Sequence, residues 1–295
     1  MNEQRIAILT DTGTNTPADF MAAHDIRAVA LRINFSDGTS YRSGEDISAQ
    51  ELMVRLTHEI PSTSLPSPEQ IREALEQARA DGYERAVFVT VSAGLSATNQ
   101  TVHMVAEQME EFPVLVINTK SIGIAAGLVV MAAAQMVEEG VPFERLEHQL
   151  DTLSSQTRLY FSTKTLTYLR KGGRISEAVY RLGSFLDIKP VITCDKDGYC
   201  AVASKARGWE RSLDAQVTLA VKHAATLSGA VRLAICCSEG NDHFDELETK
   251  LRTQLASKGV EIAEPVVRSA VSPDLLVHSG PDVVNLGVQP DWQYC

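Results

Sequence analysis

The sequence predicts an α/β fold with two lobes, a parallel sheet in the N-terminal lobe and a mixed sheet in the C-terminal lobe. The chain has 295 residues, a length at which a single core often divides in two. Short β-branched apolar runs alternate with helical patterns in the first half, as in parallel sheets with crossover helices. The second half carries a Lys-Asp-Gly turn between two apolar runs, which predicts an antiparallel hairpin. We expect the lobes to span residues 1–155 and 156–295.

The first half divides into elements at its capping and turn residues. Ser48 and Glu51 form a predicted capping box, and Ser67 followed by Pro68 marks another helix start. Gly82 ends that helix. We predict strands at 5–11, 26–35, 85–91 and 113–119, and helices at 16–24, 48–59, 68–82, from Ser96 onward and at 121–139.

The second half begins with a strand, a short helix and a second helix, the two helices separated by Gly172 and Gly173. The hairpin at 196–198 joins the next two strands. No internal repeat or low-complexity linker is visible. We predict strands at 190–193, 199–206, 231–237 and 260–267, helices at 209–226 and 241–258, and a closing segment at 272–290.

The composition argues against several classes of function. A net charge of −11 and a pI of about 5.1 argue against wrapping nucleic acid and leave at most transient contact with an anionic membrane. The longest apolar stretch, 122–137, falls short of a bilayer span, and the N-terminus lacks a signal pattern, so we expect a cytoplasmic protein. Five cysteines without a CxxC motif, and histidines without metal spacing, predict no disulfide framework, no metal site and no cofactor.

The stretch SAGLSATNQ at 92–100 lies between a predicted strand and a predicted helix, and it has more hydroxyls than one helix cap needs. Placing Ser96 at the N-cap would aim free backbone N–H groups at a carboxylate or phosphate. Capping alone is an equally open interpretation. A nucleophilic serine is a third: Gly94 fits the first glycine position of a hydrolase elbow, but Thr98 occupies the second.

Two other loops carry candidate polar groups. Thr63 lies in PSTSLPS at 61–67, where the prolines keep the chain extended and could aim the hydroxyl at a ligand. Asp11 follows the first strand and is expected to hold its loop through backbone N–H groups. No GxGxxG follows that strand, so a Rossmann phosphate turn is not predicted.

Basic residues and one histidine complete the candidates. Arg174 stands near a helix start, against the helix dipole, which suggests a carboxylate, a phosphate or a partner nearby. Lys205 and Arg207 precede another helix with the same ambiguity. His278 lies before Gly280-Pro281 and is either structural, a donor to a carboxylate or a phosphate acceptor.

Taken together, these stretches resemble the DegV family. LTDTGTNTP, TSLPS, SAGLSATNQTV, YLRKGGRIS, LGSFLDIKPVI, KARG and HSGP follow the family's order from residue 9 to about 288. The resemblance implies a DegV-like two-domain fold with a long-chain fatty acid in a tunnel between the lobes. It also implies a non-enzymatic subunit that presents the fatty-acid carboxylate to a separate ATP-dependent fatty-acid kinase, which forms the acyl phosphate.

The resemblance also assigns roles to residues. Thr63, Ser96 and His278 match the positions that hold the carboxylate. The supporting head-group loop would comprise Ser64, Gly94, Leu95 and Asp11, and the basic positions toward the head group or the partner would be Arg174, Lys205 and Arg207.

The sequence departs from the family pattern around the expected head group. Leu65 replaces a glutamine, and further changes fall at Ala93, Ala97, Asn99 and Ser279. None of them touches Thr63, Ser96 or His278. The alternatives are a serine hydrolase or phosphotransferase acting on a small acyl substrate, and a binder of another amphiphilic acid.

Overall fold

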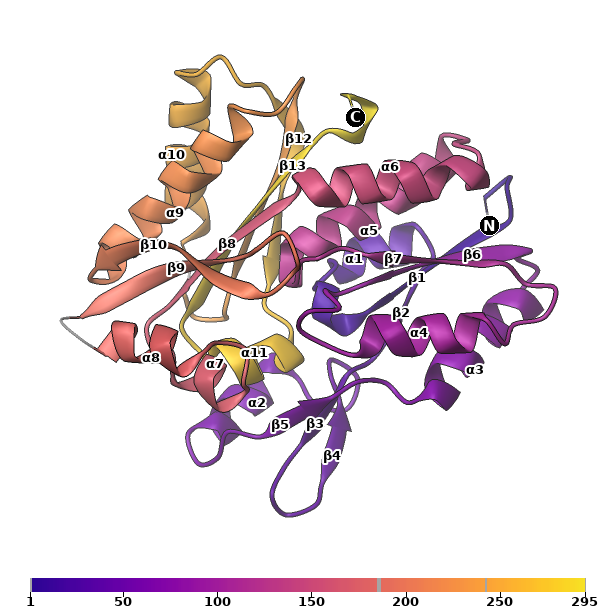
Figure 1. The fold of residues 1–295 in the computed structure, drawn as a ribbon, viewed down its shortest axis with the longest axis horizontal. Helices are drawn as coiled ribbons and strands as arrows, with labels where there is room; N and C mark the ends of the chain where they lie inside the picture. Colours follow the sequence, from indigo (N-terminus) through magenta and orange to yellow (C-terminus); the bar gives the residue numbers. More distant parts are fainter. Residues whose placement is uncertain (1, 185–186, 242, 295) are drawn as a thin grey trace.

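The computed structural model describes residues 2–184, 187–241 and 243–294, and it contains two large sheets and a small one (Figure 1). The first sheet is parallel, with strand order β2-β1-β6-β7. The second is mixed, with order β10-β9-β8-β13-β11-β12. This arrangement confirms the predicted α/β fold. The strands are β1 (Ile6–Asp11), β2 (Ile26–Val29), β6 (Arg85–Thr90), β7 (Val114–Asn118), β8 (Arg158–Thr163), β9 (Ile188–Cys194), β10 (Cys200–Arg207), β11 (Val231–Cys237), β12 (Ile262–Ala270) and β13 (Val283–Pro290).

The parallel sheet is covered by helices on both faces, which is why its strands read as continuous apolar runs. Alternate side chains of β1 face opposite sides: Ile6 and Ile8 enter one apolar cluster, while Ala7 and Leu9 enter another. The first cluster is completed by α5 and α6 with part of α1, and the second by α3 and α4. These helices are α1 (Ala18–Ala23), α3 (Pro68–Ala80), α4 (Thr98–Ala106), α5 (Gly123–Glu138) and α6 (Phe143–Gln156).

Helix α5 lies between the two large sheets. Its Val129 and Val130 pack with the parallel sheet, whereas Ala125 and Leu128 pack with the mixed sheet. This position explains why α5 is apolar on all sides, since a helix without a polar face must be buried all round. The outer face of the mixed sheet is covered by α9 (Trp209–Ala224) and α10 (Phe244–Ala256).

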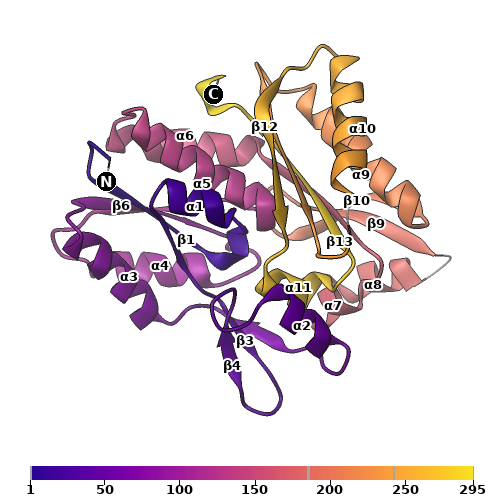
Figure 2. The same cartoon turned by 180° about the vertical axis from the view of Figure 1, so that it is seen from behind.

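The predicted strand at 26–35 is wrong as one element, because the chain leaves the parallel sheet after Val29. The residues from Arg32 begin β3 (Arg32–Asn34), which pairs antiparallel with β4 (Ser40–Arg42) and β5 (Ser62–Ser64). In Figure 2 this third sheet lies beside α2 (Ala49–Leu56) and α11 (Pro273–Ser279). A segment from the first half therefore packs against the end of the chain, and the lobe boundary at 155/156 stays a prediction.

Helix starts were predicted with mixed success. Both capping boxes are present, at Ser48 with Glu51 and at Ser67 with Gln70. The helix expected from Ser96 begins instead at Thr98, and α6 was not predicted. The hairpin is confirmed, since β9 and β10 pair antiparallel. Two short helices, α7 (Thr167–Lys171) and α8 (Glu177–Ser184), follow β8, and no helix among the described residues is long and apolar enough to cross a membrane.

Candidate functional site

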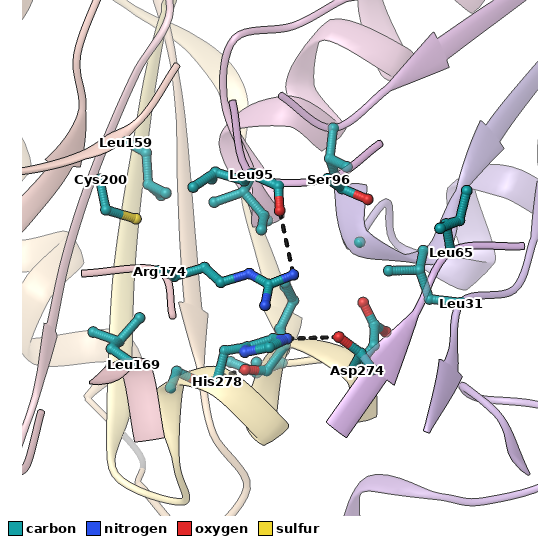
Figure 3. Close-up of a pocket in the computed structure, with 18 of the residues that line it drawn as sticks. Leu31, Leu65, Leu95, Ser96, Leu159, Leu169, Arg174, Cys200, Asp274 and His278 are labelled. Atoms are coloured by element: carbon teal, nitrogen blue, oxygen red, sulfur yellow. Dashed lines mark hydrogen bonds between the residues drawn. The ribbon is translucent and has the colours of Figure 1, made fainter. Parts of the chain in front are cut away.

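A cavity of about 550 Å³ lies where the turn after β6, strand β5, helix α11 and the inner face of the mixed sheet meet (Figure 3). This volume falls within the range of roughly 300–1,000 Å³ typical of small-molecule sites. Most of the lining is aliphatic or aromatic, which suits an apolar ligand. The larger aliphatic and aromatic lining residues are Leu31, Leu65, Val91, Leu95, Ile122, Leu159, Phe161, Leu169, Val271 and Leu275.

Thr63 and His278 meet in the wall of this cavity although 215 positions separate them in the chain. The distance from Thr63 Oγ1 to His278 Nε2 is 2.7 Å. Pairing of β5 with β3 fixes the position of Thr63, and His278 lies in the last turn of α11. Gly172 lets the imidazole approach, because a Cβ at that position would overlap Nδ1 of His278.

The imidazole of His278 is neutral at physiological pH. Burial, with a further contribution from the nearby Arg174 charge, lowers the pKa of His278 to about 3. Its buried Nδ1 has no hydrogen-bond partner among the described residues. A proton on Nδ1 would be an unsatisfied buried donor, so we assign the proton to Nε2, which donates to Thr63. The Thr63 hydroxyl then keeps its own proton free to donate into the cavity.

Ser96 lines the cavity at the entrance to α4. Its Oγ lies 2.8 Å from Thr98 Oγ1 and accepts from the Thr98 backbone N–H at 3.3 Å. Ser92 has a different role, since its hydroxyl donates to Gly198 O at 2.8 Å in the β9–β10 hairpin. Of the hydroxyls in this stretch, that of Ser92 therefore contacts the hairpin, and that of Ser96 lies in a turn that faces the cavity.

Arg174 places a cation in the cavity wall. Its guanidinium donates to the carbonyl oxygens of Gly172 and Leu95, the latter at 3.3 Å (Figure 3). Burial lowers the pKa of Arg174, yet a guanidinium stays charged at any physiological pH. No carboxylate pairs with Arg174 among the residues that the structure describes. A half-buried cation held only by carbonyls favours an anionic ligand.

Two buried carboxyls lie beside the site. Asp11 accepts from the backbone N–H groups of Gly13 and Val91, each at 3.0 Å, so it holds its loop as expected. Asp274, which the sequence did not single out, lines the cavity and is 1% exposed. Its Oδ1 accepts from the Ser43 hydroxyl, whereas Oδ2 has no partner among the described residues.

The structure brings most of the predicted site residues to one cavity. Asp11 and Gly94 stand behind the wall, Gly94 against the backbone of Gly198. Lys205 and Arg207 are exposed on β10 and do not line the cavity. Asp274 was missed because it reads as an ordinary acidic residue in a first helical turn. The predicted residues in the lining are Thr63, Ser64, Leu95, Ser96, Arg174 and His278.

The geometry does not assemble a hydrolytic pair. The nucleophile of a serine hydrolase needs a base within hydrogen-bond reach. Here Ser96 bonds to Thr98, and His278 bonds to Thr63. Among the described residues there is also no cluster of three or more His, Cys, Asp or Glu side chains that could hold a metal ion.

Comparison with known proteins settles the family. The family model described as "Uncharacterised protein, DegV family" matches residues 5–291, nearly the whole chain. The chain belongs to the DegV family. A DegV domain-containing protein of Clostridium perfringens is 28% identical over 293 residues, which cover 98% of this chain and 99% of the relative.

Solved DegV structures share the fold. A DegV family protein from Thermus thermophilus, described by its fatty-acid binding, superposes with a TM-score of 0.85 at 27% identity, covering 97% of this chain and 99% of the other. A stearic acid-binding protein from Eubacterium ventriosum gives a TM-score of 0.87 at 24% identity over the full length of both chains. The parallel and mixed sheets of this chain are therefore the DegV architecture.

Proposed function

We propose that this protein binds a long-chain fatty acid in the 550 Å³ cavity, with the carboxylate held by Thr63, Ser96 and His278, the histidine acting through its hydrogen bond to Thr63. The observation that carries the proposal is the contact between Thr63 and His278 in the wall of a mostly apolar cavity. The fatty-acid binding reported for the Thermus thermophilus relative supports the same ligand class. A carboxylate at this place would accept from the Thr63 and Ser96 hydroxyls.

The apolar cavity wall and the head-group residues contribute differently to binding. Each buried methylene contributes about 0.8 kcal/mol, so the acyl tail provides most of the affinity. The hydroxyls, the neutral imidazole and the Arg174 cation fix which end of the ligand faces them. Ser64 and Leu95 shape the wall, while Asp11 and Gly94 support the loops behind it.

We further propose that the bound carboxylate is presented to a separate fatty-acid kinase in the cytoplasm. In that step a carboxylate oxygen attacks the γ-phosphorus of ATP, the bond to the ADP oxygen breaks, and an acyl phosphate and ADP form. The sequence has neither a GxGxxG nor a GxxxxGK[ST] phosphate loop, so ATP would arrive on the partner. The exposed Lys205 and Arg207 are the proposed partner contacts on the strand that begins at the cavity residue Cys200.

The test begins with the purified protein. Denaturing it, extracting lipids and recording mass spectra should yield long-chain fatty acid at a sizeable fraction of the protein concentration. An extract without fatty acid at good protein yield would overturn the proposal, and another amphiphilic acid in its place would redirect the ligand assignment. Adding ATP and a bacterial fatty-acid kinase subunit should then produce acyl phosphate with the wild-type protein, and less acyl phosphate with the Lys205→Glu and Arg207→Glu variants.

A further inference from the structure

Asp274 raises a question that the proposed function does not answer. Figure 3 shows Asp274 on α11 beside His278, near the polar groups of the cavity. The two residues are four positions apart and so share one face of the helix. An ionised carboxylate there would repel the carboxylate of a fatty acid. Either the ligand avoids this part of the cavity, or Asp274 is not ionised.

The hydrogen bonds of Asp274 indicate which oxygen would carry a proton. Oδ1 accepts from the Ser43 hydroxyl, and the Asp274 backbone N–H donates to Ser43 Oγ at 3.0 Å. Oδ2 is buried and has no hydrogen bond within 3.5 Å among the described residues, although the Ser272 and Thr12 hydroxyls lie near the carboxyl. A neutral carboxyl with its carbonyl oxygen toward Ser43 therefore has its O–H at Oδ2, where a ligand carboxylate is a stronger acceptor than either hydroxyl.

A second buried carboxyl favours the neutral form. Asp11 is 0% exposed and Asp274 1%, and they flank Gly13: a Cβ on Gly13 would lie 3.0 Å from Oδ1 of Asp11 and 3.4 Å from Oδ2 of Asp274. Both carboxylate oxygens of Asp11 already accept backbone N–H groups, Oδ1 from Gly13 and Oδ2 from Val91, so a proton shared by the two carboxyls is better placed on Asp274. Burial raises the pKa of Asp11 to about 7, with a further contribution from any charge on Asp274 and against the hydrogen bond from Val91. Burial also raises the pKa of Asp274, although hydrogen bonds from the Ser43, Ser272 and Thr12 hydroxyls act to lower it. Two neighbouring buried carboxyls do not readily ionise together.

We propose that Asp274 binds the fatty-acid carboxylate as a neutral carboxylic acid that donates a hydrogen bond from Oδ2, and that Asp11 across Gly13 keeps Asp274 in this form. The inference rests on the proposed function and adds a fourth head-group residue to it. A carboxylic acid and a carboxylate then share one proton, which gives a strong charge-assisted hydrogen bond. Loss of that proton removes the donor and adds a repelling charge.

The proposal predicts that affinity falls as pH rises. Between about pH 6 and 9 the fatty acid in solution is already ionised, and His278 is neutral throughout. Arg174 stays cationic, and burial raises the pKa of Tyr168 above its ordinary value of 10. The other charged groups on elements around α11 have contacts of their own: Arg170 with Glu177, Lys171 with Ile60 O, Arg32 with Ser40, Arg55 with Tyr41, Arg42 with Glu45 and Asp46, and Glu51 with Ser48.

The experiment is a pH series of palmitate binding by calorimetry, run in two buffers of different ionisation enthalpy. Wild type should lose at least about ten-fold in affinity from pH 6 to 9 and should take up protons on binding near neutral pH. Asp274→Asn offers a permanent N–H donor, so its affinity should change by less than about three-fold over the range and its proton uptake should vanish. Asp274→Ala should bind weakly at every pH. The matched control Asp151→Asn changes an exposed carboxylate on α6 and should follow wild type.

The outcomes distinguish the role of Asp274 from the proposed binding of a fatty acid. Palmitate binding that is independent of pH in wild type would overturn the role of Asp274 and leave the fatty-acid site standing. The role of Asp274 is likewise overturned if Asp274→Asn keeps the wild-type pH slope while its near-ultraviolet circular dichroism shows a native fold. No binding of palmitate at any pH would overturn the proposed function and this inference together. A flat wild-type profile overturns the role of Asp274 even if the variants fail to fold.

Discussion

At the residue scale, the proposed site contains groups whose charge is set by burial. His278 is neutral, and its Nε2–H donates a hydrogen bond to the Thr63 hydroxyl. Arg174 supplies a cation that pairs with no carboxylate among the described residues. The sequence identified Thr63, Ser96, Arg174 and His278 because their loops carry distinctive turn and glycine patterns. It could not identify Asp274, since nothing in a Ser-Pro-Asp helix start reveals that the aspartate will be buried.

Replacing Thr63 by valine keeps the side-chain shape and removes the hydroxyl. We expect fatty-acid affinity to fall about ten- to hundred-fold, because a hydrogen bond to a charged group contributes about 1.5–3 kcal/mol. Titration calorimetry with palmitate would measure the change. Thr218→Val is the matched control, since that exposed hydroxyl only donates to Asp214 O on α9. Equal affinity in both variants would remove Thr63 from the site.

The pKa of His278 predicts acid sensitivity. Its folded-state pKa of about 3 lies below the ordinary 6.5, so the unfolded state binds the proton first. The stability due to neutral His278 is therefore complete above about pH 6.5 and is lost as pH falls toward 3, by at most about 1.4 kcal/mol per pH unit. Urea unfolding should show wild type approaching His278→Gln in stability from pH 7 to pH 4.5. The raised pKa of Asp11 acts in the opposite direction, but it acts in both proteins and cancels in the comparison. A constant difference between the two would contradict the assignment of a neutral imidazole.

At the element scale, the site depends on contacts between segments distant in the chain. Periodicity and capping residues located most helices and strands, because α2 and α3 carry complete capping boxes and β1 carries an apolar run. The elements that were not predicted are β4, β5, α6, α11 and β13. Sequence patterns gave wrong element boundaries where the boundary depends on which other segments the chain packs against. The run at 26–35 is apolar throughout, yet β2 and β3 belong to different sheets. The start of α4 shifted to Thr98 because Ser96 belongs to the cavity-lining turn.

The β9–β10 hairpin fixes the turn that carries Ser96. A Cβ on Gly198 would overlap the Ser92 hydroxyl, and Gly198 has a φ of +87°. Gly198→Ala should therefore lower the free energy of unfolding by about 1–3 kcal/mol more than Gly259→Ala. Gly259 has a comparable φ of +68° with nothing within 4 Å of its Cβ position, so the pair isolates the contact from backbone strain. Denaturant unfolding measures both, and equal losses would show that the hairpin contact contributes nothing.

At the scale of the whole molecule, α5 joins two sheets into one body and the cavity opens beside it. Residues 122 and 123 at the start of α5 line the cavity together with side chains from both halves of the chain. The fold class was predictable because α/β alternation and an antiparallel hairpin are local patterns. The cavity was not, because its wall combines β5, α11 and the mixed sheet, and only their packing creates the space.

An apolar cavity predicts a dependence on acyl length. Each methylene contributes about 0.8 kcal/mol, so affinity should rise about fifteen-fold from laurate to myristate and again to palmitate, until the cavity is full. Thermal unfolding should shift upward in the same order at equal ligand concentration, because ligands that bind only the folded state stabilise it. The matching alkyl alcohols, which lack the carboxylate, should bind more weakly at each length. Affinities independent of length would mean that the tail lies outside the cavity.

The most direct measurement is a crystal structure of the protein grown with palmitate. The account predicts the acyl chain inside the cavity, with the carboxylate within hydrogen-bond distance of the Thr63 and Ser96 hydroxyls and beside His278. A chain that enters in the opposite direction, with its methyl end at Thr63, or that binds elsewhere on the molecule, would contradict it.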